Sequence, residues 1–501
     1  MYERHHYIGG KDVEGTSGRF GPIFNPSIGE QQGKVALATK AEVENAIAVA
    51  ADAFPDWAET SVVRRARVMQ NLVHLLYRDK MVLAEALSKE HGKVLSDAAG
   101  EVQRGIEVAE FAQGMPHLLK GEYSDNISSG IDMYSMRKPL GVVAGIAPFN
   151  FPAMITMWMA TIAIACGNTF ILKPSEKDPS VTFLFASLLK EAGLPDGVFN
   201  IVNGDKEAVD TLCTDPRIQA VSFVGSTAIA QYVYATSTAH GKRCQAMGGA
   251  KNHMLVMPDA DLDMVADALI GSAYGSAGER CMAISVAVPV GKPVADKLVS
   301  MLKPRVEELR IGHSLDTEAE MGPLVTQDHH AKVKSYLDMA EREGADVVVD
   351  GRTFEYKMQG YENGYYLGGS LFDHVKPDMQ SYRDEIFGPT LQVVRAESFE
   401  EALALPTDHE YGNGTSIFTR DGDVARDYVN RVEVGMVGVN VPIPVPLAFH
   451  SFGGWKNSAF ADMNQHGVEG VRFYTKTKTV TSRWPKGIRA GAEFVIPTLN
   501  S

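Results

Sequence analysis

The sequence predicts an α/β protein made of two large units and a small β extension. Its 501 residues exceed what one hydrophobic core can hold, because cores stop growing at about 250–300 residues. Strand-like and helical segments alternate over residues 142–246, with Gly or Pro at the turns, which is typical of a parallel sheet covered by helices on both faces. A second alternation begins near Met254. Together these observations indicate a Rossmann-like unit followed by another α/β unit.

The N-terminal part is expected to be largely helical after a short hairpin. A turn over 7–11 separates two short strand-like segments, and apolar residues then recur at three- and four-residue steps from 40 to about 92. A further helix is expected over 96–119. Residues 133–138 are strand-like and are expected to leave the compact body.

Residues 142–246 are the most regular part of the sequence. A helix is expected to open at Asn150-Phe151-Pro152, with proline in the first turn where it is tolerated, and to end at Gly167. The remaining helices are expected over 180–192, 206–212 and 227–236, and the strands over 141–146, 169–172, 198–202 and 220–223. The tight GxGxxG fingerprint of many dinucleotide sites is absent.

The second half repeats the alternation with less regular spacing. Helices are expected over 262–278, 294–306, 398–405 and 424–432, and strands over 283–290, 391–395 and 475–482.

Composition excludes several classes of partner. The net charge of −14 opposes nucleic-acid binding, which needs a basic face. The four cysteines are widely spaced without a CxxC pair, so neither a disulfide framework nor a metal site is expected. The N-terminus lacks a signal-peptide pattern, and no apolar run reaches the roughly 20 residues of a membrane span. We therefore expect a cytoplasmic protein, or one in an organelle matrix after removal of a transit peptide, with no membrane partner.

Cys281 is the candidate nucleophile. It follows a run of small residues over 271–278, and glycine there allows a substrate to approach the sulfur closely. A thiolate can add to an aldehyde, give up a hydride from the hemithioacetal and then hold a thioester. Taken alone, however, a buried structural cysteine is the more common case.

Five motifs in order resemble the aldehyde dehydrogenase superfamily. They are the nucleophile segment 271–281, APFNFP at 147–152, KPSE at 173–176, FVGST at 223–227 and EIFGP at 385–389. The resemblance covers nearly the whole chain. It implies the aldehyde dehydrogenase fold: an NAD-binding domain over 1–120 and 141–245, a catalytic domain over 246–445, and an oligomerisation arm with a C-terminal tail over 121–140 and 470–501. A homodimer or homotetramer is expected.

The resemblance also assigns roles to individual residues. Asn150 and the backbone N–H of Cys281 would hold the oxyanion, and such donors contribute about 3–4 kcal/mol each in acyl transfer. The cofactor would be NAD, bound by Phe149, Lys173, Glu176, Gly225, Ser226, Glu385 and Phe387. A carboxylate at Glu176 favours NAD over NADP, whose 2′-phosphate would meet a like charge. Each residue also has an ordinary structural alternative: a helix cap, a solvated turn or a core aromatic.

One position departs from the superfamily pattern. Most members carry a glutamate 34 residues before the nucleophile, where it acts as general base for water attack on the thioester; here that residue is Met247. A thioether takes no proton at neutral pH, so hydrolysis loses its base. Coenzyme A, a more nucleophilic thiol, is then the expected acyl acceptor. The alternative is that another carboxylate replaces the missing base.

Two arginines suggest the substrate. Arg280 adjoins the nucleophile and Arg104 lies on a predicted helix; arginine is the usual bidentate partner of a carboxylate. Together with KNH at 251–253 and the tail segments around 470–485, they resemble the methylmalonate-semialdehyde dehydrogenase branch, whose substrate is a 3-oxo acid. Residues 154–161 differ from that branch, because they lack its prolines and phenylalanine. A surface ion pair with Glu101 or Glu107 is the alternative role for Arg104.

Three hypotheses follow. The first is a CoA-acylating dehydrogenase for malonate or methylmalonate semialdehyde, which releases CO₂ and yields acetyl-CoA or propionyl-CoA. The second is a hydrolytic NAD-dependent aldehyde dehydrogenase that yields a free acid. The third is a catalytically silent member with a binding or structural role, which the pairing of Cys281 with Asn150 argues against.

Overall fold

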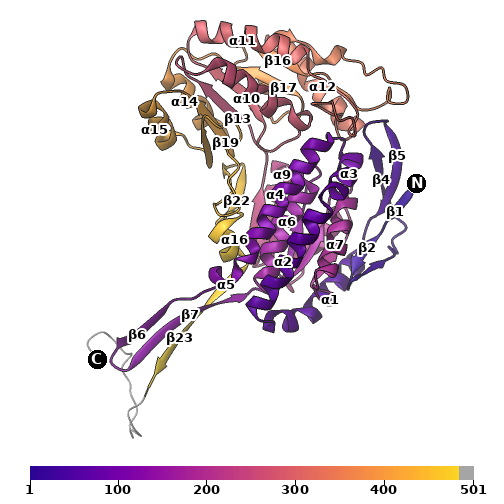
Figure 1. Cartoon of the computed structure of the whole chain (residues 1–501), viewed down its shortest axis with the longest axis vertical. Helices are drawn as coiled ribbons and strands as arrows, with labels where there is room; N and C mark the ends of the chain where they lie inside the picture. The colour runs from indigo at the N-terminus through magenta and orange to yellow at the C-terminus, as the bar shows by residue number, and fades with distance from the viewer. Residues whose placement is uncertain (485–501) are drawn as a thin grey trace.

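The structure is a computed structural model, and it describes residues 1–484. Two lobes lie one above the other, and a narrow β arm extends away from the lower lobe (Figure 1). The predicted fold class, α/β with two sheet-containing units and a β arm, is confirmed.

The first lobe is built on an eight-stranded sheet in the order β22-β12-β11-β8-β9-β10-β2-β3. The five strands from β12 to β10 run parallel, whereas β2, β3 and β22 are antiparallel to their neighbours. The strands are β2 His6–Ile8, β3 Lys11–Val13, β8 Val142–Ile146, β9 Thr169–Lys173, β10 Phe199–Ile201, β11 Ile218–Val224, β12 Arg243–Met247 and β22 Ala459–Ala461.

Helices cover both faces of this sheet. Alternate residues of β8 show why, since Val142 and Ala144 enter the hydrophobic core on one face while Val143 enters the core on the other. The helices are α1 Lys40–Glu59, α2 Val62–Arg78, α3 Lys80–His91, α4 Leu95–Gln113, α5 Met115–Leu118, α6 Pro152–Ala165, α7 Ser180–Glu191, α8 Lys206–Thr214 and α9 Thr227–Ala239. Helices α1, α8 and α9 lie on one face and α2, α3, α4, α6 and α7 on the other.

The second lobe holds a seven-stranded sheet in the order β15-β16-β17-β14-β13-β19-β20, parallel except for β15. Its strands are β13 Asn252–Val256, β14 Ile284–Pro289, β15 Asp346–Val349, β16 Ser370–Asp373, β17 Thr390–Val393, β19 Gly414–Phe418 and β20 Met436–Val439. Its helices are α10 Leu262–Tyr274, α11 Lys292–Glu307, α12 Gln327–Arg342, α13 Gln380–Arg383, α14 Phe399–Asp408 and α15 Gly422–Arg431, with short 3-10 turns η1 Gly275–Gly278 and η2 Gly351–Thr353.

The arm is a three-stranded antiparallel sheet in the order β23-β7-β6. Strand β6 spans Tyr123–Ser128, β7 spans Ile131–Pro139, and β23 spans Thr475–Arg483 after helix α16 Gly467–Phe473. Residues 485–501 of the expected tail lie outside the described residues. The remaining strands form two small sheets: β1 Tyr2–Arg4, β4 Phe20–Asn25 and β5 Glu30–Ala36, and the pair β18 Tyr411–Gly412 and β21 Trp455–Lys456.

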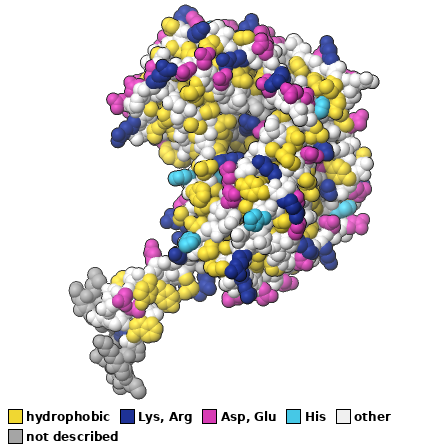
Figure 2. Space-filling model, in the orientation of Figure 1, with side chains coloured by type: hydrophobic (Ala, Val, Ile, Leu, Met, Phe, Trp, Pro, Cys, Tyr) yellow, Lys and Arg dark blue, Asp and Glu magenta, His cyan; other side chains and the backbone are white. Residues whose placement is uncertain are grey.

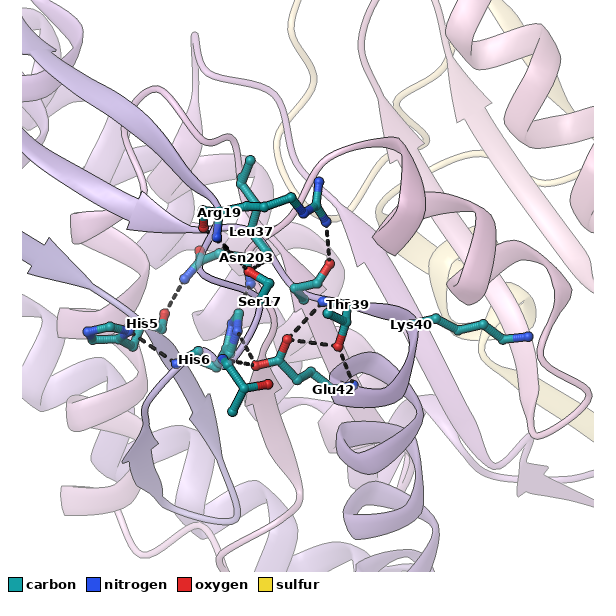
Figure 3. Close-up of polar contacts among 12 residues, drawn as sticks. His5, His6, Ser17, Arg19, Leu37, Thr39, Lys40, Glu42 and Asn203 are labelled. Atoms are coloured by element: carbon teal, nitrogen blue, oxygen red, sulfur yellow. Dashed lines mark hydrogen bonds and ion pairs between the residues drawn. The ribbon is translucent and has the colours of Figure 1, made fainter.

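The N-terminal segment is tied to the first lobe by the polar network in Figure 3. The Asn203 N–H donates to the buried His6 ring at 3.2 Å, and the Thr16 N–H donates to Glu42 at 2.6 Å. Glu42 also forms a capping box with Thr39, which satisfies orphan donors at the start of α1. Because Asn203 follows β10, the network fixes the loop that leads into α8.

Two predicted helices differ from the structure. The helix expected over 96–119 breaks at Gly114 into α4 and α5. The helix expected over 262–278 ends at Tyr274, because Ser276, Ala277 and Gly278 take left-handed backbone angles with φ of 54°, 51° and 72°. A side chain at Gly278 would collide with the carbonyl of Gly388, so the chain turns here in close contact with the loop that precedes β17.

Within residues 1–484, no helix is long and apolar enough to cross a membrane. The same residues contain no cluster of three or more His, Cys, Asp or Glu side chains suited to a metal ion. All four cysteines are free.

Candidate active site

Cys281 lies between the turn η1 and strand β14, where it lines two large cavities. One is a long cleft of about 760 Å³, and the other is a compact, mostly apolar cavity of about 230 Å³. Figure 2 shows the molecular surface hollowed between the two lobes. A nucleophile shared by two cavities can meet a different molecule from each side.

Polar groups hold the Cys281 backbone and face its sulfur. The Asn252 and Asn413 side-chain amides donate to the Cys281 carbonyl at 2.9 and 3.0 Å. The Asn150 amide donates to the Glu279 carbonyl at 3.0 Å and lies 3.5 Å from Cys281 Sγ. Burial raises the pKa of the Cys281 thiol to about 11, and the Asn150 hydrogen bond opposes that rise. Cys281 and Asn150 are thus brought together as the sequence predicted.

Asn150 is itself held by a buried ion pair that sequence analysis missed. Lys93 donates to the Asn150 carbonyl at 2.6 Å and to Glu101 at 2.8 Å, and both charged side chains are fully buried. The other oxygen of Glu101 accepts the Ala153 and Met154 N–H groups at 2.9 and 3.1 Å, at the start of α6. The pair therefore joins the end of α3, helix α4 and the Asn150 turn into one rigid unit.

The long cleft gathers every residue expected to contact the cofactor. Its walls include Phe149, Lys173, Glu176, Gly225, Ser226, Glu385 and Phe387, together with Cys281. Lys173 pairs with Glu176 at 3.1 Å. Ser226 is the N-cap of α9, so the positive end of that helix faces the cleft beside Gly225.

Near Cys281 the cleft is narrowed by two aromatic rings and a buried carboxylate. Phe149 and Phe387 meet edge to face with centroids 6.0 Å apart, and Phe387 has a left-handed φ of 61°. Glu385 accepts the Ala250 N–H at 2.9 Å, and burial raises its pKa to about 7. A Cβ atom at Gly249 would lie 2.7 Å from a Glu385 carboxylate oxygen, so the glycine leaves room for the carboxylate in this position.

The compact cavity carries two arginines against an apolar wall. The wall is formed by large side chains that include Met154, Ile155, Trp158, Met247 and Phe452. Arg104 pairs with Glu107 and donates to the Pro446 carbonyl, each at 2.6 Å. Arg280 pairs with Asp97 at 2.7 Å. Both arginines thus reach the same cavity as Cys281, although they come from different lobes.

Met247, at the end of β12, is 5% exposed and lines the cavity with Cys281. Two carboxylates also line this cavity, and both are engaged: Glu101 with Lys93, and Asp97 with Arg280.

Sequence analysis missed several polar groups near the site. Glu101 and Asp97 lie one and two turns before Arg104 on α4, a spacing that places all three on one helix face. Lys177 lies over the Phe149 ring at 4.4 Å, and its place just after the KPSE motif was the available signal. Glu279 is buried beside His91 and His329, and burial raises its pKa to about 8; nothing in the local sequence indicates this.

The model of the aldehyde dehydrogenase family matches residues 13–480. The chain belongs to the aldehyde dehydrogenase family.

Within that family, this aldehyde dehydrogenase is similar to proteins named for semialdehyde oxidation. It is 56% identical to the malonate-semialdehyde dehydrogenase of Pseudomonas aeruginosa, over 99% of both chains. It is 54% identical, with a TM-score of 0.95, to the solved methylmalonate-semialdehyde dehydrogenase of Oceanimonas doudoroffii, over 97% of this chain and 99% of that one. A Sinorhizobium meliloti protein assigned to the methylmalonate-semialdehyde dehydrogenases and solved with NAD is 60% identical, with a TM-score of 0.96 and the same coverage.

Proposed function

We propose that this aldehyde dehydrogenase oxidises malonate or methylmalonate semialdehyde with NAD and coenzyme A, and forms acetyl-CoA or propionyl-CoA with release of CO₂. The observation that carries the proposal is the compact cavity, where two arginines and Met247 surround Cys281. The arginines suit a substrate carboxylate, and the thioether leaves water without a base at that position. The semialdehydes named for the relatives support the same substrate class.

The long cleft fits NAD. Glu176 and Lys173 offer hydrogen-bonding partners for a ribose, the N-terminus of α9 suits a pyrophosphate, and the Phe149 and Phe387 rings lie close to the nucleophile. NAD, when bound, supplies the hydride acceptor. The cleft residues would bind NAD and orient its reactive end toward Cys281.

In the proposed reaction, Cys281 loses its thiol proton to solvent, its Sγ bonds to the aldehyde carbon, and the Asn150 amide holds the resulting oxyanion. Loss of the hydride leaves a thioester on Cys281. CO₂ then departs from the acyl group, because the thioester carbonyl stabilises the enolate that remains, and a proton replaces it. The coenzyme A thiolate then attacks the acyl carbon, takes over the acyl group and releases Cys281 as a thiolate.

The hydrolytic alternative rests on one specific observation. Glu385 is a buried carboxylate in the same cleft as Cys281, and its pKa of about 7 suits a general base. If Glu385 activated water, the product would be a free acid.

Product identification distinguishes the two functions. Enzyme, NAD and malonate semialdehyde are incubated with and without coenzyme A, and the products are identified by mass spectrometry, with Cys281→Ala as the inactive control. We expect one NADH per site and then slow turnover without coenzyme A, and acetyl-CoA with it. Fast linear turnover to a free acid without coenzyme A would refute the acylating function. Loss of that hydrolysis in Glu385→Gln, with the first equivalent of NADH still formed, would identify Glu385 as the base.

The assembly and location of the enzyme are also part of this proposal. The exposed arm strands β6 and β23 leave backbone groups at their outer edges, which favours pairing with a second copy in a homodimer or homotetramer. The four free cysteines fit a reducing compartment, in keeping with the cytoplasm.

A further inference from the structure

We propose that Asp97 is a positioning residue that seats the Arg280 guanidinium for the substrate carboxylate. The inference rests on the proposed function, because it assigns Arg280 to a 3-oxo acid. It concerns Asp97, a residue of helix α4 that lines the compact cavity and has no role in the proposed reaction.

Two residues, Asp97 and Gly275, hold the Arg280 guanidinium from opposite sides, and together they are called the Arg280 seat. On one side, Asp97 accepts from Arg280 Nη2 at 2.7 Å. On the other side is Gly275, where a Cβ atom would lie 2.5–2.7 Å from three atoms of the guanidinium. The guanidinium therefore lies directly against Gly275, and any side chain at 275 would have to displace it. Arg280 Nη1 also donates to the Gly271 carbonyl at 3.3 Å.

The seat is largely closed to solvent, with Asp97 16% exposed and Arg280 20% exposed. Asp97 lies in the first turn of α4, where the positive end of the helix stabilises a carboxylate. Burial disfavours its charge, but Arg280 and Lys93 outweigh this effect, so that the pKa of Asp97 is lowered. Asp97 is thus a permanent anion at neutral pH.

A permanent anion next to an anion site has two opposing effects. Its charge repels the substrate carboxylate, whereas its hydrogen bond fixes the direction of the guanidinium fork. A guanidinium has five N–H donors in one plane, so the bonds to Asp97 and Gly271 leave others for a ligand. Without Asp97, the side chain could leave the cavity or pair elsewhere. We infer that orientation of Arg280 outweighs repulsion of the substrate carboxylate, so that loss of Asp97 should weaken the reaction of a charged substrate.

The measurement is the ratio of kcat/KM for malonate semialdehyde to kcat/KM for propanal, an uncharged aldehyde. We expect Asp97→Ala to lower this ratio about tenfold, the lower end of the cost of a lost charged hydrogen bond. In an Arg280→Leu background, Asp97→Ala should change the ratio less than about twofold, because a residue that acts through Arg280 shows no additive effect. A ratio that rises or stays the same in Asp97→Ala would overturn the inference.

Two further variants secure the interpretation. Asp215→Ala is the matched control, because Asp215 is also a buried partner of an arginine, Arg217 at 2.6 Å, but lies outside both cavities. It should leave the ratio unchanged. Gly275→Ala displaces the guanidinium without removing a charge, so it decides the question if Asp97→Ala does not fold; an unchanged ratio there also overturns the seat. If Arg280→Leu alone leaves the ratio unchanged, the proposed substrate class fails, and the seat fails with it.

Discussion

The unliganded enzyme is predicted to be slow to react with alkylating agents, because its nucleophile is held as a thiol. With a pKa of about 11, only about one Cys281 in a thousand is a thiolate at pH 8, and the thiolate is the reactive form. The logarithm of the alkylation rate should therefore rise with pH at unit slope to beyond pH 10. Asn150→Ala removes the donor 3.5 Å from the sulfur and should slow alkylation about tenfold at a given pH, because a hydrogen bond to an ionised group contributes roughly 1.5 kcal/mol or more.

The assay is iodoacetamide incorporation followed by intact-protein mass spectrometry across a pH series. Cys281→Ala reports labelling of Cys166, Cys213 and Cys244, which are buried with raised pKa values and should react little. A rate that levels off below pH 9 would show that burial does not suppress the thiolate. Equal rates in wild type and Asn150→Ala would remove the amide from contact with the sulfur.

Four other changes test the remaining parts of the site. Met247→Glu should raise CoA-independent hydrolysis, an effect worth roughly 10²–10⁴-fold for a well-placed base; free acid measured without coenzyme A reports it. Glu176→Gln should raise the KM for NAD and weaken discrimination against NADP, measured as the ratio of kcat/KM values, and an unchanged ratio would place the ribose contact elsewhere. Arg104→Leu should lower kcat/KM for a 3-oxo acid by about ten- to a hundredfold and change that for propanal little; equal losses would make Arg104 structural. Deleting the chain after Phe473 removes β23 and should yield monomers or aggregates in size-exclusion chromatography; a uniform oligomer would contradict this.

Sequence patterns were sufficient to predict the first lobe closely. The strands over 142–224 and the glycines that end their helices follow rules that act over a few residues, so local sequence decides them. The η1 turn did not follow such a rule. Ser276 and Ala277 are ordinary helix residues by composition, yet both take left-handed angles, and the turn they form packs Gly278 against Gly388, more than a hundred residues away.

In the site, too, local sequence predicts some features and contacts between distant residues decide the others. Motifs predicted Cys281, Asn150 and the walls of the cofactor cleft, because each motif brings its own backbone turn. The groups that hold those residues come from other helices: Lys93 and Glu101 support Asn150 from the α3–α4 region, and Asp97 holds Arg280 across the cavity. Such pairs depend on packing between distant elements, and single-sequence patterns carry little information about them.

The arm has a consequence for how the protein matures. Strand β7 pairs along its whole length with β23, and the hydrogen bond between Arg137 and Thr475 joins residues 338 positions apart. At synthesis rates of about 5–20 residues per second, β7 waits roughly 17–70 seconds on the ribosome before its partner exists. Throughout that interval β7 is paired with β6 on one edge only. Its other edge offers unpaired backbone groups to any strand that it meets. The first sheet takes up its last strand, β22, only shortly before β23 is made, so the arm closes last. A chain stalled before β23 would therefore carry an open, aggregation-prone edge on β7.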